Sequence, residues 1–222
     1  MQVIQGVTGI WWGVMGCVQS SALIARRRRD GVTDVNCRRR PVKRPVPQHE
    51  FLSDHEKELV LDTWQQLADD PVAIGTDVFL RIFQLAPDAR RAFPSFVSQS
   101  DSQLVDSVLF RSHATRFVRA VDFVMSNLDA LDVIVVANLV RLGRHHAATV
   151  PEFHCDYLAM FERAMTDVWA ERLGGRYFDA NTRCAWSKIF RLITSNVSDG
   201  YNEYNATAST TVAMSGTNER RV

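Results

Sequence analysis

The stretch LGRHHAATVPEF, residues 142 to 153, places two adjacent histidines near the end of an apolar helical pattern. His146 follows Leu142 by four residues and Leu139 by seven, whereas His145 is in phase with Arg141. Because an α-helix has 3.6 residues per turn, adjacent side chains cannot share one face. The pattern therefore predicts that His146 points into the protein and that His145 leans toward solvent.

A second inward histidine lies on another apolar stripe. Residues 102–128 predict one long amphipathic helix, whose inward positions are spaced three or four apart: Phe110, His113, Phe117, Val121, Val124 and Leu128. Taken alone, a histidine in such a stripe is more often a hydrogen-bonded core residue than a ligand. Two buried histidines on different helices pay for desolvation twice, and a metal between them would offset that cost.

The kind of metal follows from what the two stripes lack. Neither stripe has a cysteine or a carboxylate at ligand spacing, so a closed zinc site is not expected. Two imidazoles that face each other across a flat apolar slot lined with phenylalanine are better suited to haem iron.

The other periodic segments predict an all-α protein with one folded domain. Ser53 and Glu56 form a capping-box pattern, Asp70 and Pro71 begin a second helix, and no segment shows sustained strand-like alternation. Further helices are expected over residues 152–172 and 179–198, with a short turn-like connection over 86–96. The expected organisation is a disordered basic arm (1–50), a helical domain (51–201) and a disordered tail (202–222).

Taken together, residues 51–201 resemble the globin family, and within it the neuroglobin and globin X branch. SHATRF resembles the segment that carries the distal histidine, and LGRHH resembles the one that carries the proximal histidine. GTDVFLRIF is similar to the second globin helix, and CAWSKIF to the tryptophan segment of the last helix. The resemblance implies a globin fold of about eight helices around a haem pocket.

The resemblance also implies the site residues. Haem b would be the cofactor, His146 the fixed iron ligand, and His113 a distal residue that itself binds iron at rest. The other expected haem contacts are Phe79, Phe93, Phe96, Phe117, Leu142, Val150 and Phe153. Two features depart from the branch: Phe117 is bulkier than the usual valine, and residues 94–108 lack the cysteine pair of some neuroglobins.

The implied function is reversible binding of O2 or another small ligand (NO, CO or nitrite), with an O2-sensing or redox role. If His113 binds iron at rest, an external ligand has to displace it, which lowers the apparent affinity. The alternative is a redox enzyme: a nitrite reductase, an NO dioxygenase or an electron-transfer globin. A third hypothesis is a membrane-tethered helical protein without haem, in which both histidines are structural.

The basic arm carries a candidate lipid anchor. Residues 1–50 have a formal charge of +6, which leaves −5 for the rest of the chain. MGCVQS, residues 15–20, fits the myristoylation pattern if translation starts at Met15 or processing exposes Gly16, and Cys17 is a candidate for palmitoylation. Globin X proteins resemble this chain in an acylated Met-Gly-Cys start. Two acyl chains and the arginine clusters would hold the protein at the cytoplasmic face of the plasma membrane.

Two other interpretations of the arm remain open. With translation from Met1, the uncharged residues 1–25 before RRRR could form a weak signal anchor. Alternatively, the arm is a basic tail without a membrane role. A nucleic-acid partner is not expected, because no aromatic residues interleave with the arginines. The four cysteines form no CxxC pair, which favours a reduced cytoplasmic setting.

Overall fold

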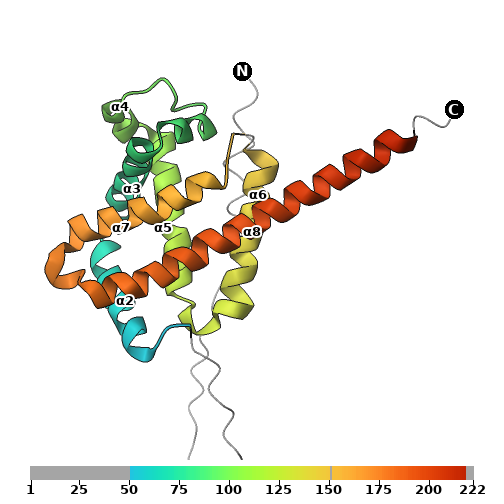
Figure 1. The fold of residues 1–222 in the computed structure, drawn as a ribbon. Helices are drawn as coiled ribbons and strands as arrows, with labels where there is room; N and C mark the ends of the chain where they lie inside the picture. Colours follow the sequence, from blue (N-terminus) through green and yellow to red (C-terminus); the bar gives the residue numbers. More distant parts are fainter. Residues whose placement is uncertain (1–50, 151, 219–222) are drawn as a thin grey trace, which may run out of the picture. The chain divides into compact units, whose positions relative to one another are not determined.

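The computed structural model describes residues 51–150 and 152–218, with side chains described up to residue 209. The arm of residues 1–50, with Gly16 and Cys17, lies outside the described residues. Every regular element in the described ranges is helical, as the all-α prediction requires (Figure 1). The α-helices are α2 (Asp54–Leu67), α3 (Pro71–Leu85), α4 (Asp101–Asp106), α5 (Val108–Met125), α6 (Val136–Thr149), α7 (Asp156–Tyr177) and α8 (Ala180–Asn218). Shorter helices cover Pro87–Ala92, Leu128–Ala130 and Leu131–Val135.

The first two helices begin where their capping residues predict. The Ser53 hydroxyl accepts the Glu56 N–H at 3.3 Å, and the Glu56 carboxylate accepts the Ser53 N–H at 2.9 Å. Asp70 accepts the Ala73 N–H at 2.9 Å, directly before Pro71 begins α3. Such caps each contribute about 1 kcal/mol, because they satisfy N–H groups that have no partner inside the helix.

The predicted single helix over residues 102–128 is in fact two helices, α4 and α5. Ser107 separates them with an extended backbone (φ −72°, ψ 119°), and its hydroxyl accepts the Phe110 N–H at the start of α5. Serine favours such breaks because its side chain can replace a backbone partner. Leu128 of the predicted stripe lies beyond the end of α5, in a short 3-10 helix.

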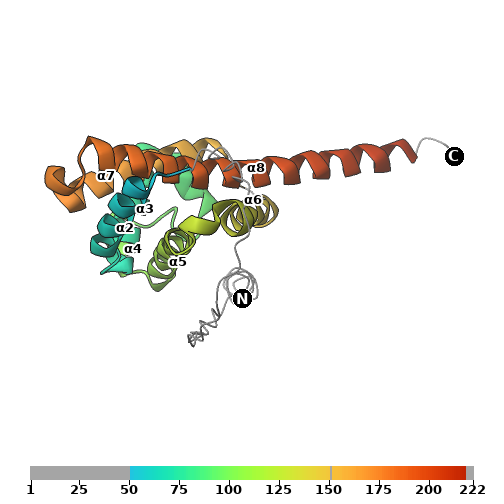
Figure 2. The ribbon, with the colours of Figure 1, turned by 90° about the horizontal axis from the view of Figure 1, so that it is seen from below.

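The last helix is longer than predicted. α8 continues to Asn218, so residues 202–218 are helical where the sequence pattern had suggested a disordered tail. No proline or glycine interrupts residues 201–215. The hydroxyls of Thr207 and Ser209 donate to the carbonyls of Glu203 and Asn205, one turn earlier, without breaking the helix. This end of α8 extends beyond the other helices (Figures 1 and 2).

A cluster of three tryptophans joins α2, α7 and α8. The rings of Trp64, Trp169 and Trp186 lie 5.5 to 6.2 Å apart, centre to centre. The Trp186 indole N–H donates to the Thr63 hydroxyl at 2.9 Å, and that of Trp64 to the Asp122 carboxylate at 3.0 Å. All three rings are buried, so this cluster is one centre of the core.

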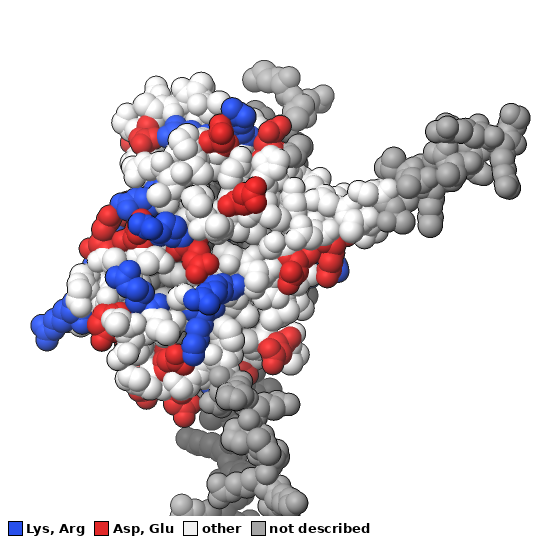
Figure 3. All heavy atoms as spheres, in the orientation of Figure 1, with Lys and Arg blue, Asp and Glu red and all other residues white. Residues whose placement is uncertain are grey.

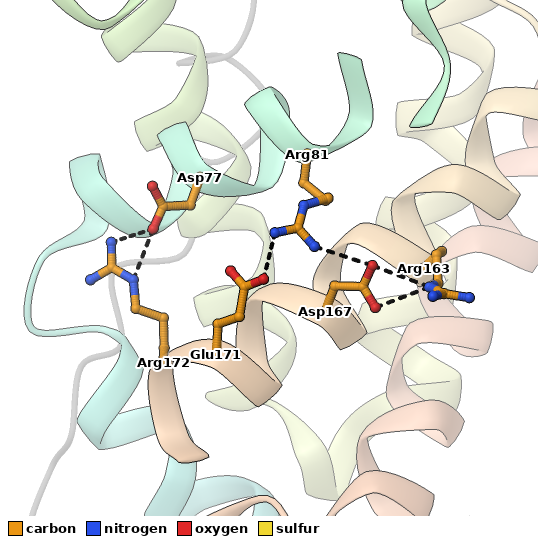
Figure 4. A network of polar contacts seen from close by, with 6 residues as sticks. All are labelled: Asp77, Arg81, Arg163, Asp167, Glu171 and Arg172. Atoms are coloured by element: carbon orange, nitrogen blue, oxygen red, sulfur yellow. Dashed lines mark hydrogen bonds and ion pairs between the residues drawn. The ribbon is translucent and has the colours of Figure 1, made fainter. Parts of the chain in front are cut away.

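Charged side chains join α3 to α7 at the surface (Figure 4). Arg81 of α3 donates to Asp167 at 3.3 Å and to Glu171 at 2.5 Å, both on α7. Arg163 also binds Asp167, and Arg172 of α7 donates back to Asp77 of α3. These contacts hold in place the helix that carries Phe79.

No single helix in the described ranges is both long and apolar enough to cross a bilayer. Helix α5 and residues 128–149 meet that test only as a pair, bent by 70°. Both segments supply buried residues to the core, among them Phe110, Val121 and Leu139.

Candidate functional site

His113 of α5 lies among aromatic rings. Its imidazole centre is 4.9 Å from the ring of Phe79 on α3 and 4.9 Å from the ring of Phe93. Burial, together with the positive charges of Arg116 and His146, lowers the pKa of His113 to about 3. The imidazole is therefore neutral near pH 7 and keeps a lone pair that can bind a metal.

His146 of α6 is oriented by the backbone of its own helix. Its Nδ1 lies 2.9 Å from the carbonyl oxygen of Leu142, one turn earlier. Because a carbonyl only accepts, Nδ1 carries the proton, and in the neutral ring the lone pair is on Nε2. The ring also packs against Phe153 at 4.9 Å. Burial lowers the pKa of His146 despite the bond to Leu142, so this imidazole also favours its neutral form.

The structure brings the two predicted inward histidines together from different helices. A charge on His146 is close enough to lower the pKa of His113. Within the residues that the structure describes, no group of three or more His, Cys, Asp or Glu side chains could hold a metal ion. An ion between His113 and His146 would therefore need further ligands from outside these side chains.

His145 has a different position from its neighbour. Its ring centre is 6.3 Å from that of His146, and its side chain is half-buried rather than fully exposed. Its backbone carbonyl accepts the Thr149 hydroxyl at 2.7 Å. A positive charge on His145 would lower the pKa of His146, so His145 is a neighbour of that ring.

The other predicted site residues divide into two groups. Near His113, Phe117 contacts the same Phe79 ring at 5.6 Å, while Phe96 stacks on Phe93 at 5.5 Å and so supports it from behind. Near His146, the Val150 carbonyl accepts the Phe153 N–H at 3.0 Å at the end of α6. In the described ranges, Phe79, Phe93 and Phe153 make ring contacts with one of the two histidines, and Leu142 contacts His146 through its carbonyl. Within those ranges, Phe96, Phe117 and Val150 make no ring contact with either histidine.

Two residues of the site were missing from the prediction. Phe161 of α7 lies 5.6 Å from Phe79 and 5.8 Å from Phe117. Arg116 follows His113 by three residues on the same side of α5, and its Nε is buried without a hydrogen-bond partner, although another nitrogen of the group donates to Ser112. The sequence held a partial signal for Phe161, which is in helical phase with Tyr157 and Ala164 and is therefore expected to face inward, but none for Arg116.

Comparison with known proteins assigns the class. The globin family model matches residues 76–197, more than half of the chain. Cytoglobin-2 of Danio rerio is 26% identical over 162 residues, which cover 72% of this chain and 87% of that protein. Neuroglobin of Dissostichus mawsoni is 28% identical over 153 residues, which cover 68% of this chain and 94% of that protein.

A solved structure shares the fold. It is the crystal structure of a hexacoordinated haem protein from an anhydrobiotic tardigrade at pH 4. The TM-score is 0.65 at 22% sequence identity, and the match covers 71% of this chain and 99% of that one.

The chain therefore belongs to the globin family, as the resemblance had indicated. Its cofactor is a haem, and its ligands are small gases such as O2.

Proposed function

We propose that this globin is six-coordinate at rest, with His146 and His113 binding the iron of haem b from opposite sides. The observation that carries the proposal is the placement of two histidines on different helices among aromatic rings, His113 of α5 beside Phe79 and His146 of α6 beside Phe153. In the described ranges, no group of three or more His, Cys, Asp or Glu side chains could hold a metal ion instead. The tardigrade protein of the same fold is a hexacoordinated haem protein, which supports this coordination.

The surroundings of the two histidines fit haem b, which is flat, largely apolar and carries two carboxylates. Phe79, Phe93 and Phe117 near His113, and Phe153 near His146, offer apolar ring surface. The buried Nε of Arg116 lacks a partner, and a guanidinium is well suited to binding a carboxylate. Arg116 would thus pair with a haem carboxylate.

His146 and His113 would have different roles on the two sides of the haem. Haem supplies an iron that binds small ligands reversibly and can change oxidation state. His146 is held by the Leu142 carbonyl and by Phe153, so it is the fixed ligand. His113 makes ring contacts, but no hydrogen bond to its own helix is seen in the part of the chain that the structure describes. It is therefore the ligand that an external molecule would displace.

Displacement of His113 has two consequences. It reduces apparent affinity by the fraction of protein in which the iron is accessible, which suits sensing or redox chemistry better than bulk transport. A displaced His113 could still donate its ring N–H to a small ligand, whereas the Phe79 side chain has no donor. Two imidazole ligands would also favour electron transfer, because neither would have to leave the iron when the iron changes oxidation state.

We also propose that acyl chains on Gly16 and Cys17, with the arginine clusters of the arm, hold the protein at the cytoplasmic face of the plasma membrane. The support is the MGCVQS pattern and the +6 charge of residues 1–50, which would attract anionic lipid.

Titration of the haem-free protein with haem tests the cofactor assignment. We expect an absorption endpoint at one haem per chain, accompanied by quenching of the fluorescence of the tryptophan cluster. Absence of a defined endpoint, with a folded protein by circular dichroism, would refute a specific haem site.

A further inference from the structure

Helices α6 and α8 meet backbone to backbone beside His146. A Cβ atom added to Gly143 of α6 would lie 2.0 Å from the carbonyl oxygen of Val197 and 2.9 Å from the amide nitrogen of Tyr201. The reverse also holds: a Cβ on Gly200 of α8 would lie 1.9 Å from the carbonyl oxygen of Val140. Both glycines are buried. Each helix thus contributes one glycine, and each glycine accommodates the backbone of the other helix.

This crossing adjoins the residues that hold His146. Gly143 precedes His146 by three residues and directly follows Leu142, whose carbonyl accepts the imidazole N–H at 2.9 Å. On α8, Tyr201 follows Gly200 and donates from its hydroxyl to the carbonyl of Phe153 at 2.9 Å. The Phe153 ring in turn packs on His146 at 4.9 Å. Adjacent residues of α8 therefore contact the helix of His146 and also the aromatic residue beside it.

We propose that Gly143 and Gly200 are positioning residues, whose reciprocal contact sets the place of His146 relative to the iron. The obstructing atoms are backbone atoms, so an added methyl group cannot be accommodated by rotating a side chain and has to move α6 away from α8. Because His146 is fixed to the α6 backbone through Leu142, its imidazole moves with the helix. The proposal rests on the proposed role of His146 as an iron ligand.

Two other glycines of the chain provide matched controls. Gly75 of α3 is also confined by backbone, since a Cβ there would lie 2.5 Å from the carbonyl oxygen of Ala114, next to His113. Gly175 is unconfined, because an added Cβ there would meet no atom within 4 Å. A general loss of packing would affect Gly75→Ala and Gly143→Ala alike, whereas positioning of His146 is affected only by substitutions at the α6–α8 crossing.

The test is resonance Raman spectroscopy of the iron–histidine stretching band in the reduced full-length chain. A His113→Leu background leaves His146 as the sole protein ligand, and the band then reports the His146 bond directly. We expect Gly143→Ala and Gly200→Ala to shift or split the band and to accelerate haem transfer to a scavenger globin at least tenfold. Gly75→Ala and Gly175→Ala should leave the band in place.

Tyr201→Phe keeps the test decisive if the α6–α8 variants do not fold. It adds no volume and removes only the hydrogen bond to Phe153, so we expect a folded protein with a smaller shift of the same band. An unchanged band in every folded variant among Gly143→Ala, Gly200→Ala and Tyr201→Phe would overturn the proposal, as would an equal shift in Gly75→Ala. Absence of any iron–histidine band in the His113→Leu background itself would instead contradict the proposed role of His146.

Discussion

His145 and His146 have different roles because adjacent side chains of a helix point in directions about 100° apart. His146 is tied to the Leu142 carbonyl through Nδ1 and packs on Phe153, whereas His145 makes neither contact among those that the structure describes. We expect His146→Ala to weaken haem binding by more than the ~10–100-fold that loss of an outer-shell partner costs. His145→Ala should bind haem nearly as the natural chain does, and absorption titration measures both.

Comparable haem affinities for the two alanine variants would contradict the assignment of His146. Circular dichroism of the haem-free variants is the control, because an unfolded His146→Ala would lose haem for an unrelated reason.

The guanidinium of Arg116 is partly buried, and its hydrogen bonds are incomplete. Its Nε is buried and unpartnered, and burial lowers the pKa of its guanidinium. Arg116→Met keeps the apolar stem and removes the charge. We expect the variant to leave the haem-free protein equally stable or about 1 kcal/mol more stable, and to weaken haem binding. Urea unfolding and haem titration give the two values.

The prediction is specific because haem binding should weaken while the stability of the haem-free protein does not fall. A variant that destabilises the haem-free protein while binding haem normally would show that Arg116 has only a structural role. Arg119→Met, at an exposed position one turn further along α5, is the matched control.

At the scale of the elements, the ion pairs of Figure 4 fix α3 against α7. The Arg81 side chain is one-quarter exposed and contacts two carboxylates, whereas Arg172 and Asp77 are each 41% exposed. Ion pairs are stronger when they are shielded from water, so we expect Arg81→Met to lower the free energy of unfolding by about 1 kcal/mol and Arg172→Met by less. Thermal or urea unfolding at low and high salt measures both losses.

The Arg81 loss should shrink at high salt, because screening already weakens the pair in the natural chain. An equal loss in both variants, independent of salt, would show that packing of the side-chain stems accounts for the effect.

Local sequence signals predicted most of the helices and the central pair of the site. The Ser53–Glu56 box and the Asp70–Pro71 start act within one turn, and the phase of His113 and His146 follows from helix geometry alone. The break at Ser107 was not predicted, because no proline or glycine marks it in the sequence. The contact of Phe161 with Phe79 depends on how α7 packs against α3, which no local pattern encodes. The lack of a hydrogen-bond partner for the Nε of Arg116 likewise depends on how the surrounding helices pack.

At the scale of the whole molecule, charge is distributed differently in the arm and in the rest of the chain. On the face shown in Figure 3, basic and acidic side chains alternate over α3 and α7 and form no large area of one sign. The basic excess of the sequence is confined to residues 1–50, while the remainder carries −5. Electrostatic attraction to an anionic surface would therefore act through the arm.

Gly16→Ala tests whether the arm is acylated. N-myristoylation requires an N-terminal glycine, so we expect the variant, expressed in eukaryotic cells, to move largely from the membrane fraction to the soluble fraction. Gly31→Ala is the matched control, because it adds the same methyl group to the arm outside the motif and should leave membrane binding intact. Membrane association that persists in Gly16→Ala would contradict the acylation proposal and favour a hydrophobic anchor in residues 1–25.

The central claim is that two imidazoles of this chain, from α5 and α6, bind one haem iron at rest. The absorption spectrum of the reduced, ligand-free protein tests it most directly, with His113→Leu as the reference. We predict a sharp, split pair of visible bands, typical of a six-coordinate iron, that collapses to one broad band in His113→Leu. A single broad band in the natural chain, identical to that of His113→Leu, would contradict the account.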